Sequence, residues 1–266
     1  MHRIIQKVTG GGEAMKFTMT VSPDFSPDHI AGWYIFNTWL QKQTNESIHL
    51  ELYDSFERQR EDIKAGKIDL IYANPYDASM LIRDKGFTAI AAPVNKSDEA
   101  IICVNSESDY HKVEDLKENC NIATASDPEV STIGMIMLEP ADLNPANINV
   151  TEYQNYVMVA KNLINGKEDA GFFLKEGYED MSKFLRSQLR PIVTSQISVI
   201  RHNFLIGPSF FENSDLEVDD MRELLAEMHS SEKGKSTLQS LGFNKWEQQS
   251  QDDAEFMIDL MDTLIT

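Results

Sequence analysis

Residues 63–79, IKAGKIDLIYANPYDAS, contain the clearest fold signal in the sequence. The polar helix before Gly66 ends at that residue, because glycine readily adopts the left-handed conformation that closes helices. An apolar strand follows at once, and Pro75 then breaks this strand and starts a second helix that ends at Gly86. The stretch therefore predicts a helix, a strand and a helix in direct succession, which is typical of an α/β fold.

The same alternation continues on both sides of this stretch. The first convincing strand begins at Lys16, and the helix after it has Ser26 as its predicted N-cap and Pro27 at its first position. A fresh series of strands and helices begins after the loop near residue 96, and the chain then returns to strands and a run of helices. The pattern predicts largely parallel sheets in two lobes, with an extension at 1–15, a first lobe of 16–95 plus 196–266, and a second lobe of 96–195.

Composition limits the classes of function. The chain has 266 residues, of which 41% are hydrophobic and 25% charged, as in globular proteins. Its formal charge of −19 argues against a nucleic-acid partner, which requires a concentrated basic surface. No apolar run is long enough to cross a bilayer, so the sequence does not predict an integral membrane protein.

The first residues, MHRIIQKVTGGGEAMKFTMTV, have no apolar segment before the glycine triplet and do not resemble a secretory signal. As written, the sequence predicts a cytoplasmic protein, and a periplasmic one if its start is wrongly assigned. Met15 is the alternative start to Met1, because the first strand begins directly after it.

Neither a metal nor a cofactor is predicted. The six histidines are scattered without ligand spacing. Cys103 and Cys120 lie in apolar, strand-like runs and are expected to be buried free thiols, with a redox pair between neighbouring strands as the alternative. No catalytic motif is present, so no catalytic residue is predicted and an enzyme is not expected.

Residues 123–138, ATASDPEVSTIGMIML, predict a short strand, a polar bend and an amphipathic helix that opens on Ser131 and Thr132. Ser131 is either an ordinary N-cap of its own helix or part of an anion site. In the second case the backbone N–H groups, the hydroxyls and the helix dipole hold the anion, since this stretch contains no Lys or Arg.

Four segments occur together in an order that resembles one family, the PhnD-like periplasmic binding proteins of phosphonate, phosphite and phosphate ABC importers. The resemblance covers residues 16–245. The segments are VSPDFSP (21–27), IKAGKIDLIYANPYDAS (63–79), VEDLKENCNIATASDPEVSTIG (113–134) and LINGKEDAGFF (163–173).

The resemblance implies a type II periplasmic-binding-protein-like fold, in which two α/β lobes are joined by two crossover strands and hold a ligand cleft between them. The crossovers are expected near 93–99 and 194–201. The implied function is a solute-binding protein that closes on a phosphate-, phosphite- or phosphonate-like oxyanion for ABC transport or sensing. Its implied partners are this small anion and an ABC permease or a signalling protein.

The resemblance also points to site residues. Ser131 and Thr132 match the family's hydroxyl-rich helix start. Tyr76 stands close to a family tyrosine position that is itself lost here. Ser22 and Ser26 belong to the first-lobe loop, where a second helix start would face the anion.

Two places that carry acids in aminophosphonate-binding members hold Leu174 and His202 here, which predicts a ligand without an ammonium group. His202 would donate to an oxyanion if protonated. Asp24 and Asp28 oppose an anion site unless they point outward or accept a hydrogen bond from a ligand hydroxyl.

Two other hypotheses remain open at this point. One is a cytoplasmic enzyme on the same fold, as in some menaquinone-pathway proteins. The other is an adaptor that has lost ligand binding, with the apolar stripe near the C-terminus as its surface, although core packing explains that stripe better.

Overall fold

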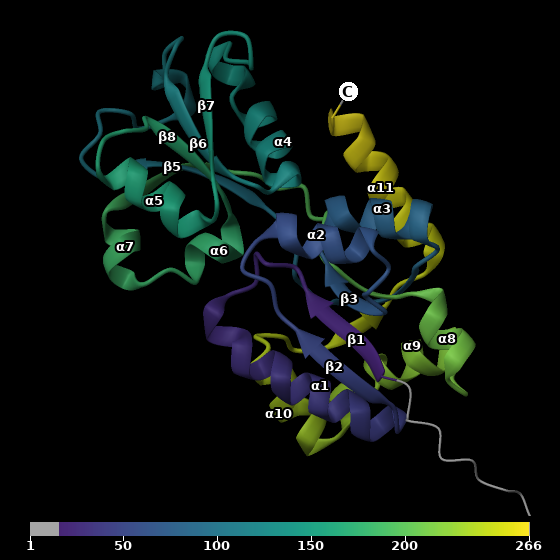
Figure 1. The fold of residues 1–266 in the computed structure, drawn as a ribbon. Coiled ribbons are helices and arrows are strands. Elements are labelled where there is room, and N and C mark those ends of the chain that lie inside the picture. Colours follow the sequence, from purple (N-terminus) through teal and green to yellow (C-terminus); the bar gives the residue numbers. More distant parts are fainter. Residues whose placement is uncertain (1–15, 266) are drawn as a thin grey trace, which may run out of the picture.

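The computed structural model describes residues 16–265, with side chains for 17–263. The predicted extension at 1–15, including the alternative start at Met15, lies outside the described residues. Figure 1 shows two α/β lobes, one containing β1–β3 and the other β5–β8. The predicted class, two α/β lobes of the type II binding-protein kind, is confirmed.

The first lobe is built on a six-stranded sheet in the order β11-β4-β10-β3-β1-β2. Its strands are β1 (Lys16–Val21), β2 (Ser47–Glu51), β3 (Leu70–Ala73), β4 (Thr88–Pro93), β10 (Asn203–Ile206) and β11 (Trp246–Gln248). Its helices are α1 (Ile30–Thr44), α2 (Phe56–Lys64), α3 (Pro75–Lys85), α8 (Pro208–Asn213), α9 (Val218–Ala226) and α10 (Glu232–Ser240).

The second lobe is built on a five-stranded sheet in the order β7-β6-β8-β5-β9. Its strands are β5 (Ala100–Asn105), β6 (Asn121–Ala125), β7 (Asn149–Tyr153), β8 (Ala170–Leu174) and β9 (Leu189–Thr194). Its helices are α4 (Pro128–Met137), α5 (Tyr156–Ile164), α6 (Lys175–Glu179) and α7 (Lys183–Ser187). Short 3-10 turns lie at 27–29, 113–115, 139–141 and 228–230.

The local signals of the sequence produce these elements. Ser26 caps the 3-10 turn that leads into α1, Asn74 caps α3 with Pro75 at its first position, and Gly86 closes α3 with a φ of +70°. The sheets are mixed instead of largely parallel, because β10 returns antiparallel to both β3 and β4 and β5 runs antiparallel to β8 and β9. The chain that crosses between lobes must re-enter each sheet in the reverse direction.

The two connections between the lobes are residues 94–99, from β4 to β5, and residues 195–202, from β9 to β10. The carboxylate of Glu99 fastens one connection to the other, since it accepts hydrogen bonds from the backbone N–H groups of Ile197 (2.9 Å) and Ser198 (2.8 Å) and from the Ser195 hydroxyl. Burial opposes the charge of Glu99, but these hydrogen bonds outweigh it and lower its pKa.

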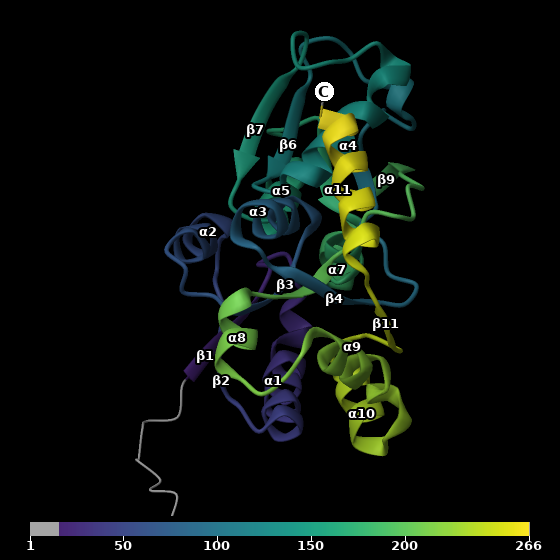
Figure 2. The same ribbon diagram turned by 90° about the vertical axis from the view of Figure 1, so that its right-hand side faces the viewer.

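The last helix, α11 (Gln251–Ile265), runs from the first lobe alongside α4 of the second, as Figure 2 shows. Met257 and Ile258 pack into the core of the first lobe, whereas Met261 packs into that of the second. Arg83 of α3 forms ion pairs with Asp259 (2.9 Å) and Asp262 (2.6 Å). The expected core role of the C-terminal stripe is therefore confirmed at its buried positions.

Two expectations about single residues are settled. Cys103 and Cys120 are free and buried, as expected. A redox pair between neighbouring strands is wrong, because β8 lies between β5, which carries Cys103, and β6, which follows Cys120. Within residues 16–265, no helix combines the length and the apolar character needed to span a membrane.

Candidate functional site

A cavity of about 390 Å³ lies between the lobes, and we call it the interlobe cavity. The first lobe contributes the loop from β1 to α1 and the turn before α2, and the second contributes the start of α5 and the chain from α6 to α7. Its apolar lining includes Phe25, Ile30, Tyr156, Val157 and Leu185. Among the described residues its charged lining is acidic: Asp24, Asp54 and Asp180. Its volume is that of a site for a small molecule.

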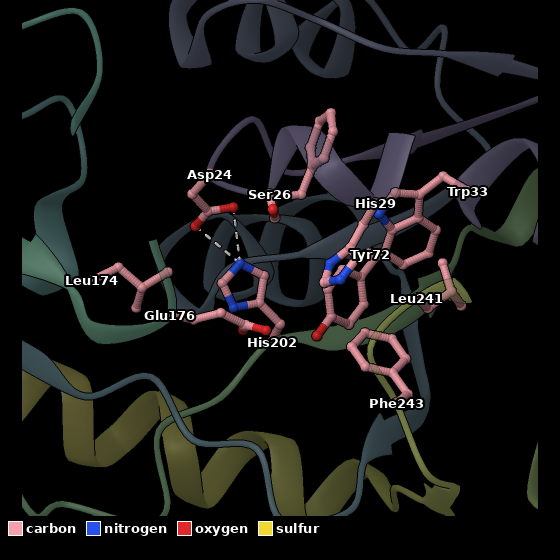
Figure 3. Close-up of a pocket in the computed structure, with 11 residues that line it drawn as sticks. Asp24, Ser26, His29, Trp33, Tyr72, Leu174, Glu176, His202, Leu241 and Phe243 are labelled. Carbon is pink, nitrogen blue, oxygen red and sulfur yellow. Dashed lines mark hydrogen bonds and ion pairs between the residues drawn. The ribbon is translucent and has the colours of Figure 1, made fainter. Parts of the chain in front are cut away.

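A smaller cavity of about 30 Å³ adjoins it, because Asp24 and Ser26 line both. Figure 3 shows the His202 imidazole among the lining residues of this cavity, with the Asp24 carboxylate on one side and the rings of Tyr72 and Phe243 on another. The Tyr72 and His202 rings stack with their centroids 5.1 Å apart. The second crossover therefore places its histidine at the junction of the lobes.

His202 is held between two carboxylates. Its Nδ1 lies 2.8 Å from Asp98 Oδ2, and its Nε2 lies 3.0 Å from Asp24 Oδ2. Burial disfavours a charged imidazole, but the two carboxylates outweigh it and raise the pKa of His202 well above its ordinary value. His202 is therefore an imidazolium that donates from both ring nitrogens, and its charge is already neutralised by protein groups.

The pKa values of the two carboxyl groups, Asp24 and Asp98, shift in opposite directions. Burial also acts on Asp24, but the charge of His202 and hydrogen bonds from His202 and Ser22 outweigh it and lower the pKa of Asp24. Burial dominates at Asp98 and raises its pKa despite His202. Asn74 supports this arrangement from the start of α3, because its Nδ2 donates to Ser22 Oγ over 3.0 Å.

A second acidic group faces Asp24 from the other lobe. Asp127 and Glu129, at the start of α4, each offer a carboxylate oxygen, and these and an oxygen of Asp24 lie within 4.8 Å of one another. Burial and the charge of Asp24 raise the pKa of Asp127 to about 6. Burial and the charge of Asp127 raise the pKa of Glu129 well above its ordinary value. We call these three residues the carboxylate cluster.

This cluster predicts a decline in stability with rising pH. An acid whose pKa is raised by folding binds more protons in the folded state, so its contribution is present at low pH and is lost as pH rises through the folded pKa. We expect the free energy of unfolding to fall by roughly 2 kcal/mol between pH 5 and pH 7. Urea denaturation across this range measures it, and Glu129→Gln, a neutral side chain of equal size, should flatten the slope. An unchanged slope in this variant would contradict the assignment.

The structure brings together some of the predicted site residues. Ser26 and His202 line the smaller cavity, as does Leu174, and Ser22 lies buried behind Asp24. Tyr76 lines a different cavity, of about 480 Å³, formed by α2, α3 and α11. Ligand contacts by these residues stay a prediction.

The expected helix start at Ser131 is wrong. Helix α4 begins at Pro128 with Asp127 as its N-cap, so Ser131 lies within the helix and its N–H donates to the Asp127 carbonyl over 3.0 Å. The hydroxyl of Thr132 donates to the Pro128 carbonyl over 2.8 Å, and that of Ser131 pairs with Thr124 Oγ1 at 2.6 Å. A proline after an N-cap aspartate is the stronger start signal, and it places carboxylates where hydroxyls were expected.

Sequence reasoning missed Asp98, Asp127 and Glu129. Asp98 is remote in sequence from His202, and Asp127 and Glu129 are remote from Asp24, so no local spacing marks these contacts. The Asp-Pro-Glu segment at 127–129 was a readable signal for the true start of α4.

The fold and the cavity together define a class of protein. Two α/β lobes, two connecting segments and a cavity between the lobes are the features of a bilobal solute-binding protein. The family model described as "ABC transporter, phosphonate, periplasmic substrate-binding protein" matches residues 19–254, and the chain belongs to this family.

Solved structures share the fold. PhnD1 from Prochlorococcus marinus in complex with methylphosphonate superposes with a TM-score of 0.80 at 12% identity, covering 94% of this chain and 98% of its own. A binding protein component of an ABC phosphonate transporter from Pseudomonas aeruginosa gives 0.72 at 14% identity, covering 96% and 90%. The periplasmic aliphatic sulphonate binding protein SsuA from Escherichia coli gives 0.66 at 14% identity, covering 94% and 86%. The comparison with curated proteins found no match.

Proposed function

We propose that this protein is a solute receptor that closes its lobes on a small molecule bound in the interlobe cavity. The observation that carries the proposal is this cavity, which both lobes line and whose volume of about 390 Å³ suits a small solute. Membership of a substrate-binding family supports it. An enzyme is not favoured, because the relatives are substrate-binding proteins.

The side chains favour a ligand that carries a cationic group and an apolar body, which differs from the ligand without an ammonium group that the sequence predicted. Among the described residues, neither Lys nor Arg lines the two cavities, and the one buried cation, His202, is already paired with Asp24 and Asp98. Acidic groups and exposed apolar side chains such as Val157 line the interlobe cavity instead. The oxyanion expected from the family stays a prediction, supported by the family description and by the methylphosphonate complex of one relative.

The receptor would serve either an ABC permease or a signalling partner. The family description supports the permease, since its members are the substrate-binding components of ABC transporters. The same closure of the lobes would present the ligand-bound form to either partner.

Thermal unfolding with two panels of solutes tests the ligand chemistry. One panel contains phosphate, phosphite, methylphosphonate and sulfate, and the other contains ethylammonium, ethanolamine and choline. A ligand that binds the folded state alone stabilises it by about 2.7 kcal/mol at about one hundred times its dissociation constant. We expect stabilisation by members of the cationic panel and none by the anions.

A pair of valine variants locates the site. Val157→Trp should abolish the stabilisation, because Val157 lines the interlobe cavity. Val150→Trp is the matched control, since Val150 is also an exposed valine of the second lobe but lies on β7. Stabilisation by the anions alone would restore the oxyanion hypothesis, and equal stabilisation of both variants would remove the cavity as the site.

A further inference from the structure

The three residues of the carboxylate cluster come from both lobes. Asp24 comes from the loop after β1 in the first lobe, and Asp127 and Glu129 come from the start of α4 in the second. One oxygen from each residue lies within 4.8 Å of the others. Like charges at this distance repel strongly when they are removed from water.

Two buried oxygens of the cluster have no hydrogen-bond partner outside it. Asp127 Oδ2 accepts a hydrogen bond from the Tyr156 hydroxyl, whereas among the described residues Asp127 Oδ1 and Glu129 Oε2 are paired only through a hydrogen bond between the two carboxyl groups, which requires a shared proton. Both residues are 1% exposed. Once that proton is lost, two buried carboxylates face each other unpaired, which is strongly destabilising unless a positive or hydrogen-bond-donating group takes its place.

The positive charges that face the cluster are already engaged. His202 is paired with Asp24 and Asp98. Arg60 acts electrostatically on Glu129, but its guanidinium donates to both Asp77 oxygens over 2.7 and 3.2 Å. The groups from neighbouring elements therefore leave the two oxygens without a counter-charge.

We propose that Asp24, Asp127 and Glu129 hold a compact cation between the lobes, so that binding of the cation and closure of the lobes are linked. The inference rests on the proposed function and deepens it, because it places a charge-recognition subsite beside the interlobe cavity. Three carboxylates suit a hard divalent ion, which prefers oxygen ligands. They equally suit the ammonium group of a solute, which has three N–H donors.

Because the three residues come from both lobes, binding of the cation is linked to closure of the lobes. Separation of the lobes carries Asp24 away from Asp127 and Glu129 and divides the site. A cation that needs all three carboxylates therefore binds the closed form more tightly, and by reciprocity it favours closure. A proton shared by Asp127 and Glu129 is the competing occupant, so the cation should bind more tightly as pH rises.

Calorimetric titration of chelator-treated protein at pH 7.5 tests the inference with CaCl₂, MgCl₂, MnCl₂ and ethylammonium chloride as probes. We expect at least one probe to bind, and Glu129→Gln to weaken it by roughly tenfold or more. Glu118→Gln is the matched control, since Glu118 is an exposed glutamate of the same lobe, and it should bind like the unaltered protein. Binding of a metal ion identifies a free cation as the source, and binding of ethylammonium alone identifies the solute's own amine.

Absence of binding by all four probes, or equal binding by Glu129→Gln, would overturn the inference and leave the shared proton as the occupant. If a metal ion binds through Glu129 but no solute of either panel stabilises the protein, the proposed function alone is contradicted. If a solute stabilises the protein but Glu129→Gln changes the binding of no probe, the inference alone is contradicted.

Discussion

Replacing His202 by alanine should lower the free energy of unfolding by about 3–5 kcal/mol at pH 7, because it leaves two buried carboxylates without their counter-charge. The side chains of Asp24 and Asp98 are 2% and 8% exposed, so bulk water screens their charges little. Urea denaturation measures the loss. The loss should shrink as pH falls, because burial without the imidazolium raises the pKa values of both carboxyls and their protonation removes the repulsion.

His49 provides the control for this variant. Its Nε2 lies 3.0 Å from Glu51 Oε2, but both side chains are about half exposed. Because an exposed ion pair contributes little, His49→Ala should change the free energy of unfolding by less than about 1 kcal/mol. Similar losses in the two variants would show that burial between Asp24 and Asp98 does not decide the role of His202.

Replacing Glu99 by alanine should cost roughly 3 kcal/mol, because the N–H groups of Ile197 and Ser198 lose a charged acceptor. Glu99 is 7% exposed, which limits its replacement by water. Amide hydrogen exchange at residues 197 and 198 should also accelerate, since these N–H groups would open to solvent locally. Lower stability together with faster exchange would show that Glu99 fixes one interlobe connection to the other.

Glu118→Ala is the reference for this effect, because Glu118 is exposed on the second lobe. It should leave stability and the exchange rates at residues 197 and 198 unchanged. A stable Glu99→Ala protein with unchanged exchange would mean that the connections keep their conformation without this carboxylate.

The fold was predictable because its signals are local. Gly66, Pro75 and Gly86 close or open elements within a few residues of themselves, and the structure places each at an element boundary. The direction of the strands was less predictable. It depends on how the chain re-enters each sheet after crossing between lobes, which no local pattern records.

The site was less predictable than the fold. Ser26 and His202 were found from their place in the chain, and both line the smaller cavity. The carboxylate cluster was missed, because Asp24 and Asp127 are adjacent in space and remote in sequence. The family resemblance led to Ser131 and Thr132 at the start of α4, where this chain places Asp127 and Glu129 instead. Because carboxylates stand where hydroxyls were expected, the proposed ligand is a cation and not an oxyanion.

The distance between the lobes shows whether this protein closes on its ligand. Spin labels at Glu57→Cys on α2 and Lys161→Cys on α5 report the separation, since both positions are exposed and the native cysteines are buried. A pair within the first lobe, Glu57→Cys with Lys233→Cys, is the control. We expect the solute or cation that stabilises the protein to shorten and narrow the interlobe distances and to leave the control unchanged. Identical interlobe distances with and without that ligand would contradict a receptor that closes on its ligand.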